Sequence, residues 1–193
     1  MKEADRTELL KALAFALEAH GNQTRKGSDV PYASHLLQVA GLVLEHGGGI
    51  DQAIAALLHD VVEDCEGVTQ EQIERRFGPD VARIVGDCTD TLPGDRPGEK
   101  SPWRLRKESF VGRLEKVDAR SALVCVCDKR HNLGALVVDV QVAGTDYLER
   151  FSASGPELVW YFEAILAAVR PHIPAGLRDD YEARLDEFRK LVG

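Results

Sequence analysis

One hexapeptide in this chain carries residue types and a spacing that suit hydrolytic chemistry. His59 is followed directly by Asp60, and Glu63 and Asp64 stand one helical turn further on. These four residues follow an apolar run that is expected to be buried. Burying a charged side chain without a partner is costly. A divalent cation is one such partner, because imidazole nitrogen and carboxylate oxygen are suitable ligands for manganese, iron or zinc. From the hexapeptide alone, a metal centre and a capped or salt-bridged helix end are equally good interpretations.

Two further segments favour the metal centre. His35 begins the helix that precedes the apolar run, so the two helices are expected to pack together. Asp128 lies in the middle of another apolar helix, and Asn132 follows it by one turn on the same face. His131 points away from Asp128 and is expected to pack near the site rather than bind the metal.

Helical periodicity runs through nearly all of the sequence. The first apolar face ends at His20-Gly21, and Thr69 with Gln72 forms a capping box for a short helix closed by Gly78-Pro79. The apolar run 122–126 would suit a buried strand, but the continued spacing beyond it favours a helix. We predict a loop over residues 92–102, and helices over 35–45, 52–64, about 80–90, 105–116, 119–140, 146–151, 156–170 and 177–191.

These elements predict an all-α fold, a single compact helical bundle of about eight to ten helices. A length of 193 residues suffices for one well-buried core and argues against a second domain. We therefore treat residues 1–193 as one domain, with 171–193 as its C-terminal helix. A net charge of −8 argues against nonspecific binding to nucleic acid.

The sequence also indicates a cytoplasmic protein that does not enter the membrane. No apolar run approaches the roughly 20 residues that cross a bilayer, and the N-terminus lacks the features of a signal peptide. The four cysteines lack the paired spacing of a zinc knuckle, so we expect small buried residues in a reducing compartment. At helix ends, His20, His46 and His172 are expected to be capping or surface residues.

A series of short motifs follows in order along the chain. They are Thr24-Arg25-Lys26-Gly27, Pro31-Tyr32 through His35, residues 55–64, Phe77-Gly78, Thr89-Asp90, and Asp128-Lys129 with His131-Asn132-Leu133. With these motifs the chain resembles the hydrolase domain of the Rel/SpoT alarmone enzymes, in the stand-alone form called small alarmone hydrolases, within the HD phosphohydrolase superfamily. The resemblance is strongest over residues 8–170 and includes the segments Glu149-Arg150-Phe151 and Trp160-Tyr161-Phe162.

The resemblance implies a complete site. Glu63 and Asp64 would be the catalytic residues that assist the attacking water, with Glu63 the first choice as proton acceptor. One divalent cation, in this family usually Mn²⁺, would be held by His35, His59, Asp60 and Asp128. The nucleotide would be contacted by Arg25, Lys26, Asn132 and Tyr161. From the residues alone, Tyr161 would equally suit the core, and Tyr32 would equally brace its loop.

The implied reaction is hydrolysis of a guanosine or adenosine alarmone such as (p)ppGpp, which would lose its 3′-pyrophosphate. Because the site is rich in carboxylates, this anionic nucleotide needs local cations in addition to the metal. Lys100 and Arg104 are predicted to supply them, with Arg106 and Lys107 as further candidates from the segment 92–107. For each one taken alone, a solvated surface is the more conservative interpretation. Gly134 replaces an arginine that many members carry, which leaves the substrate less defined than the metal.

Three other functions fit the same residues. An HD phosphohydrolase could act on (p)ppApp or on the 2′-phosphate of NADPH, because selectivity depends on pocket shape. A catalytically silent nucleotide-binding or interaction module would have no need for both the ligands and the Glu63-Asp64 pair. An antitoxin could hydrolyse the product of a toxic nucleotide synthetase. The sequence leaves the oligomeric state undetermined.

Overall fold

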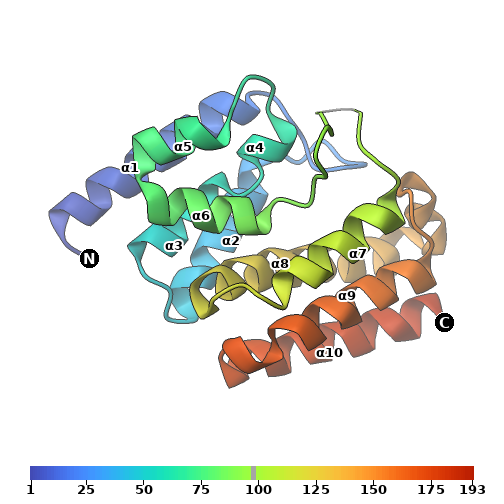
Figure 1. Cartoon of the computed structure of the whole chain (residues 1–193). Coiled ribbons are helices and arrows are strands. Elements are labelled where there is room, and N and C mark those ends of the chain that lie inside the picture. Colours follow the sequence, from blue (N-terminus) through green and yellow to red (C-terminus); the bar gives the residue numbers. More distant parts are fainter. Residues whose placement is uncertain (97–98) are drawn as a thin grey trace.

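The computed structural model describes residues 1–96 and 99–193, and its regular elements are all helices, as predicted (Figure 1). Among these residues no strand occurs, and isolated bridges join Thr24 to Pro31 and Arg96 to Glu99. Pro97 and Gly98 of the predicted loop 92–102 lie outside the described residues. The α-helices are α1 (Glu3–His20), α2 (Ala33–Glu45), α3 (Ile50–Leu58), α4 (Val61–Asp64), α5 (Gln70–Phe77), α6 (Pro79–Cys88), α7 (Trp103–Leu114), α8 (Ala119–Ala143), α9 (Gly155–Val169) and α10 (Ala175–Val192). Two 3₁₀ helices, η1 (Thr145–Arg150) and η2 (Arg170–His172), flank α9.

Local capping signals place α5 and α6 where the sequence predicts them. The Thr69 hydroxyl accepts from the amide of Gln72, and the Gln72 side chain accepts from the amide of Thr69, each over 3.3 Å. Gly78 ends α5 with a φ of 90°, a backbone conformation that favours glycine, and Pro79 opens α6. The predicted capping box and helix boundary are both confirmed.

The predicted continuous helix over 52–64 is wrong. α3 ends at Leu58, and His59 and Asp60 form a turn before the short helix α4. The Nδ1 atom of His59 lies 2.7 Å from the carbonyl oxygen of Ala56. In a continuing helix that carbonyl would bond to the amide of Asp60, so the side chain competes with the helix for its acceptor. The break places the side chains of His59 and Asp60 in a turn, where they face the same point.

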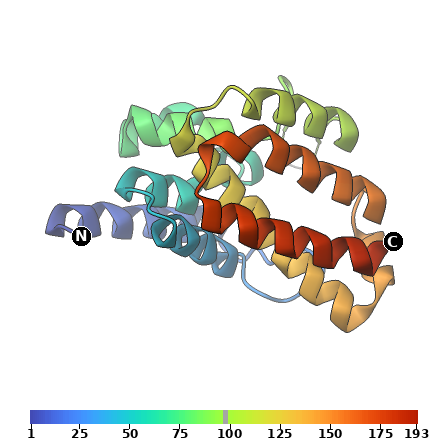
Figure 2. The ribbon, with the colours of Figure 1, turned by 90° about the horizontal axis from the view of Figure 1, so that it is seen from below.

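α8 is the central helix of the bundle. α2, α3 and α6 pack on its N-terminal half, and α9 and α10 lie side by side beyond it (Figure 2). The run 122–126 belongs to α8 and is buried, which confirms the helix over the strand interpretation. The buried apolar side chains form one continuous cluster to which every α-helix contributes. The chain ends lie at opposite ends of the molecule in both views (Figures 1 and 2).

The four cysteines are buried free thiols, as predicted. Two of them, Cys88 at the end of α6 and Cys125 on α8, have sulfur atoms 3.1 Å apart. The predicted helix over 146–151 is the 3₁₀ helix η1 rather than a turn of α-helix. No helix in the described part of the chain is long and apolar enough to span a membrane.

Candidate metal centre and adjoining pocket

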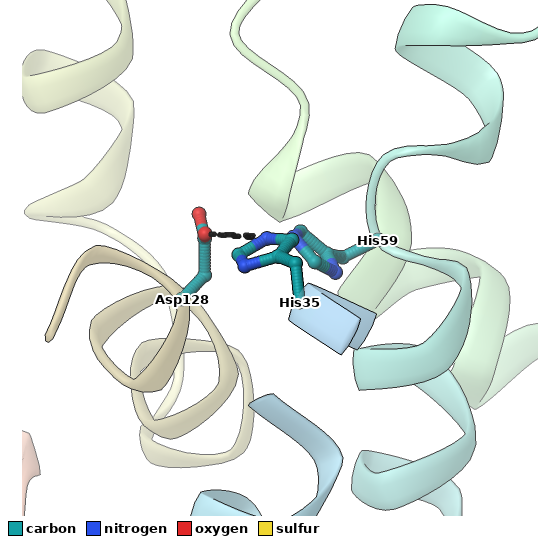
Figure 3. A group of neighbouring side chains, drawn as sticks. All are labelled: His35, His59 and Asp128. Carbon is teal, nitrogen blue, oxygen red and sulfur yellow. Dashed lines mark hydrogen bonds and ion pairs between the residues drawn. The ribbon is translucent and has the colours of Figure 1, made fainter. Parts of the chain in front are cut away.

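Three buried side chains from separate elements converge at the middle of the molecule (Figure 3). His35 comes from the first turn of α2, His59 from the turn after α3, and Asp128 from α8. Their ligand atoms all lie within 4.8 Å of one another. The Nε2 atoms of the two histidines are 3.2 Å apart, and Oδ1 of Asp128 is 3.2 Å from the first and 3.5 Å from the second.

Asp60 directs its carboxylate to the same point. Its Oδ2 atom lies 2.9 Å from Nε2 of His59 and 3.5 Å from Nε2 of His35. The Tyr32 hydroxyl donates to this oxygen over 2.5 Å and fixes the carboxylate. The structure therefore brings together all four residues that the sequence resemblance names as ligands.

Hydrogen bonds at the far side of each imidazole ring fix its orientation. Since a carbonyl only accepts, Nδ1 of His59 must donate to Ala56, so Nε2 is the nitrogen that faces the centre and would bind a metal ion there. Nδ1 of His35 lies 2.8 Å from Nδ1 of His131. Burial lowers the pKa of His131 to about 4, and a neutral His131 ring can accept a proton from Nδ1 of His35, which leaves Nε2 of His35 to face the centre. His131 thus contacts a candidate ligand from behind, as the sequence predicts.

The electrostatics of the centre favour a cation. Burial disfavours the protonated form of His59, but the carboxylates of Asp60 and Asp128 outweigh it and raise the pKa of His59 well above its usual value. Burial alone would raise the pKa of Asp128, but the positive charges of Lys129 and His59 hold it well below its usual range. Two imidazole nitrogens and two carboxylates are donors that suit manganese, iron or zinc. The residues present therefore fit a divalent metal ion.

The carboxylates of Glu63 and Asp64 lie beside this centre on α4. Lys100 bridges them, with its Nζ 2.7 Å from Glu63 and 2.9 Å from Asp64. The other oxygen of Glu63 accepts from the amide of Asp90 over 3.1 Å. Burial raises the pKa of Asp64, and the charges of Asp60 and Glu63 add to this effect. Such a pair suits proton transfer next to a metal ion.

A cavity of about 650 Å³ opens next to the centre, between the α1–α2 loop and helices α7, α8 and α9. Its wall is joined to the centre by hydrogen bonds: Arg25 donates to Asn132 over 2.9 Å, and Asn132 donates to Asp128 over 2.6 Å. Of the residues predicted for catalysis or substrate, six line this cavity: Arg25, Lys26, Asp64, Lys107, Asn132 and Tyr161.

Lys100 and Arg104, the first two cations predicted from the segment 92–107, are placed differently from one another. Lys100 reaches the Glu63-Asp64 pair. Arg104 pairs with Glu108 over 2.7 Å, and its guanidinium stacks 3.4 Å from the centroid of the Trp160 ring. Arg104 is absent from the cavity lining, because the face of α7 that meets the cavity carries Trp103 and Lys107, four residues apart. The structure does not bring Arg104 into the site.

Several residues of the site were missed or misplaced by the sequence. The expectation that His20 is a capping or surface residue is wrong: it is 4% exposed and stacks on Tyr32 with ring centroids 4.7 Å apart. Its Nδ1 pairs with Gln23 over 2.7 Å. Lys129 lines the cavity and contacts Asp128 over 2.6 Å. Tyr32 and Lys129 stand inside the sequence motifs of His35 and Asp128, and this proximity was the only signal in the sequence that they belong to the site.

Comparisons with known proteins agree with this site. The chain matches the HD domain family over residues 12–148. It is 38% identical over 133 residues to guanosine-3′,5′-bis(diphosphate) 3′-pyrophosphohydrolase MESH1 of Xenopus tropicalis, covering 67% of this chain and 70% of the relative. The Drosophila melanogaster protein of the same name is 33% identical over 141 residues, covering 72% and 74% of the two chains.

Two solved structures have the same fold. One, described as a metazoan ortholog of SpoT that hydrolyzes ppGpp, superposes with a TM-score of 0.70 at 26% identity and covers 95% of this chain and 94% of that one. The other, lmo0812 from Listeria monocytogenes, has a TM-score of 0.69 at 23% identity over 81% of this chain and 99% of that one. An all-helical fold around a His-His-Asp cluster defines an HD domain. Within that class, the chain belongs to the ppGpp hydrolase family.

Proposed function

We propose that this protein is a metal-dependent hydrolase that removes the 3′-pyrophosphate from a guanosine alarmone of the ppGpp type. The observation that carries the proposal is the hydrogen-bonded path from the cavity to the centre, through Arg25, Asn132 and Asp128. This path supports the proposal because it puts the cavity wall next to a candidate metal ligand, so that a nucleotide in the cavity could present its reacting phosphate there. The activity for which the relatives are named supports the same reaction.

His35, His59, Asp60 and Asp128 hold the cation, for which we propose Mn²⁺. When bound, a divalent cation polarises the phosphoryl group and makes water a stronger nucleophile at neutral pH. Ligand orientation comes from residues behind the ligands, namely Tyr32 on Asp60, the Ala56 carbonyl on His59 and Asn132 on Asp128. Such contacts preserve the geometry of a metal site.

Glu63 and Asp64 handle the proton of the attacking water. Glu63 is the first acceptor, held by the amide of Asp90, and Asp64 is the second. Lys100 bridges both carboxylates and limits their mutual repulsion. Water adds to the phosphorus attached to the ribose 3′ oxygen and gives a proton to Glu63. The bond to the 3′ oxygen breaks, that oxygen takes up the proton, and pyrophosphate and a nucleotide with a free 3′ hydroxyl leave.

The cavity suits a nucleotide in size and chemistry. Its volume of about 650 Å³ is typical of small-molecule sites. Arg25 and Lys26 supply positive charge at one side, and Asn132 and Tyr161 supply polar groups on a wall that also carries aromatic and aliphatic side chains. These cations allow an overall acidic chain to take up an anionic substrate.

The test incubates purified protein and Mn²⁺ with ppGpp, pppGpp, ppApp and NADPH, and measures pyrophosphate and phosphate release. We expect pyrophosphate from ppGpp, abolished by Asp60→Ala and retained by Asp146→Ala, which removes an exposed carboxylate. Pyrophosphate from ppApp alone would move the substrate to adenosine alarmones, and phosphate from NADPH alone to the 2′-phosphate. If every nucleotide survives while the metal is demonstrably bound, the proposed function fails.

A further inference from the structure

Lys107 is a cation of the cavity wall to which the proposed function gives no role. It lies on α7, lines the cavity, and places its ammonium 4.9 Å from the centroid of the Tyr161 ring. Its side chain is only 14% exposed. A buried ammonium group is costly without a counter-charge. The charges around Lys107 therefore show whether the site is already neutral or has room for an anion.

The partner of Lys107 is a carboxylate that it shares with a second cation. Asp90, just after α6, has a side chain 4% exposed and contacts both Lys107 and the neighbouring Arg106. Two positive charges against one negative charge leave a buried surplus of positive charge. Lys129 differs, since its carboxylate partner Asp128 belongs to the candidate metal centre, and Lys100 differs because it faces two carboxylates.

The surplus charge faces groups from several elements. Asp90 contacts the Lys107 ammonium and is shared with Arg106, Glu63 of α4 and Asp60 lie near the ammonium, and α8 and α9 present Asp128, Lys129 and Tyr161. Burial and repulsion by Lys129 lower the pKa of Lys107 to about 8, although the carboxylates oppose this shift. An anion between the two ammonium groups would relieve their repulsion. The same place is next to the reaction, because the amide of Asp90 holds Glu63.

We propose that Lys107 is a further substrate-binding residue that contacts phosphoryl oxygens of the nucleotide, and that Asp90 is a positioning residue that holds the Lys107 ammonium in the cavity. This inference rests on the proposed function and deepens it. It also gives the motif Thr89-Asp90 a physical role: one residue orients Glu63 through its amide and Lys107 through its carboxylate.

The first experiment titrates inorganic pyrophosphate into the metal-loaded full chain by calorimetry. We expect Lys107→Met to weaken binding by roughly 10- to 100-fold, the range for one charge-assisted hydrogen bond, and Lys107→Arg to retain most of it. Lys116→Met, which removes an exposed lysine just after α7, should bind like the unchanged chain. Folding is expected to survive in Lys107→Met, because Arg106 still neutralises Asp90. Equal affinity of Lys107→Met and Lys116→Met would overturn the inference.

The pH dependence separates binding from a structural role. The unchanged chain should lose about tenfold more affinity for pyrophosphate between pH 7 and pH 9 than Lys107→Arg, because lysine deprotonates near its pKa of about 8 while arginine stays charged. Identical pH profiles for the two proteins would count against Lys107 as the anion's contact.

The second experiment measures steady-state kinetics for Asp90→Asn and Asp90→Glu. We expect Asp90→Asn to raise KM more than it lowers kcat, since the backbone amide of residue 90 still holds Glu63. Asp90→Glu should restore part of the affinity. A fall in kcat alone would overturn the positioning role, and if Asp90→Asn does not fold, Asp90→Glu and Lys107→Met decide. The calorimetry needs no turnover, so an inactive protein would sink the proposed function while leaving Lys107 testable. If the protein is active but Lys107→Met leaves the affinity for pyrophosphate unchanged, only this inference is overturned.

Discussion

At the scale of single residues, the centre depends on groups that stand behind the ligands. The Tyr32 hydroxyl donates to Asp60, and the Tyr32 ring in turn stacks on buried His20. Neither Tyr32 nor His20 is one of the four candidate metal ligands, yet both limit how the Asp60 carboxylate can move. The orientation of the carboxylate is therefore set by a packed aromatic pair rather than by the turn alone.

We expect Tyr32→Phe to lower metal affinity by roughly 10- to 100-fold, the usual cost of losing such a supporting contact. The change removes only the hydroxyl and keeps the ring on His20. A titration of the metal-free protein with Mn²⁺ measures the effect. Tyr181→Phe is the matched control, because its hydroxyl donates to the Phe162 carbonyl away from the centre. Indistinguishable affinities for the two variants would show that the Asp60 contact is dispensable.

Glu63→Gln tests the proton acceptor without removing the side chain. The single amide oxygen can still accept from Lys100 or from the backbone amide of Asp90, though not from both, and the amide cannot take up a proton, so the rate should fall by roughly 10²- to 10⁴-fold. Metal content, measured on the same sample, should be unchanged. Glu66→Gln, an exposed carboxylate just after α4, should keep full activity. Loss of metal in Glu63→Gln would instead make Glu63 part of the metal site.

At the scale of elements, the sequence was informative wherever a local signal decides a boundary. Thr69 with Gln72 and Gly78 with Pro79 fix their own helix ends, and the structure has both. The break after α3 was not predictable in this way. Apolar spacing continues through Val61 and Val62, and the helix ends because the His59 ring bonds the Ala56 carbonyl, a choice of rotamer that depends on the residues around the site.

The face of α7 shows the same limit. Arg104 and Lys107 are three residues apart in a cationic segment, and the sequence analysis placed Arg104 ahead of Lys107 as a substrate contact. Only the packing of α7 against α9 decides that Lys107 meets the cavity while Arg104 lies over Trp160. The motif residues of the centre were predictable because each type has metal-binding chemistry. A lysine has no such distinguishing chemistry until its neighbours are known.

Gly48 controls the approach of α2 to α3, the two elements that bring His35 and His59 together. A Cβ atom there would lie 2.4 Å from Cγ1 of Val43 and 2.7 Å from its carbonyl oxygen. We expect Gly48→Ala to destabilise the fold by about 1–3 kcal/mol, the cost of forcing extra atoms into a packed site. Gly41→Ala on α2 meets open space and should stabilise by about 0.5–1 kcal/mol. Chemical denaturation measures both, and a neutral Gly48→Ala would mean that the junction relaxes freely.

At the scale of the whole molecule, helical periodicity was enough for the all-α fold but not for its layers. The length and apolar spacing of the last helices say that they are buried on one face, not that α9 and α10 lie together beyond α8 (Figure 2). This arrangement matters for function, because α9 closes the cavity opposite the α1–α2 loop. The cavity is thus a product of long-range packing, whereas the centre is a product of motifs.

The centre joins α2, the turn after α3, and α8, so metal binding should stabilise the whole fold. A cation that binds only the folded chain adds about 2.7 kcal/mol at a hundredfold excess over its Kd, which for a chain of this size raises Tm by roughly 5–10 °C. Without it, two carboxylates and two imidazole nitrogens crowd within a few ångströms. Thermal unfolding with Mn²⁺ and with a chelator measures the shift, and His59→Ala should abolish it. If Mn²⁺, Fe²⁺ and Zn²⁺ all leave Tm unchanged, the four side chains are a buried polar cluster and not a metal centre.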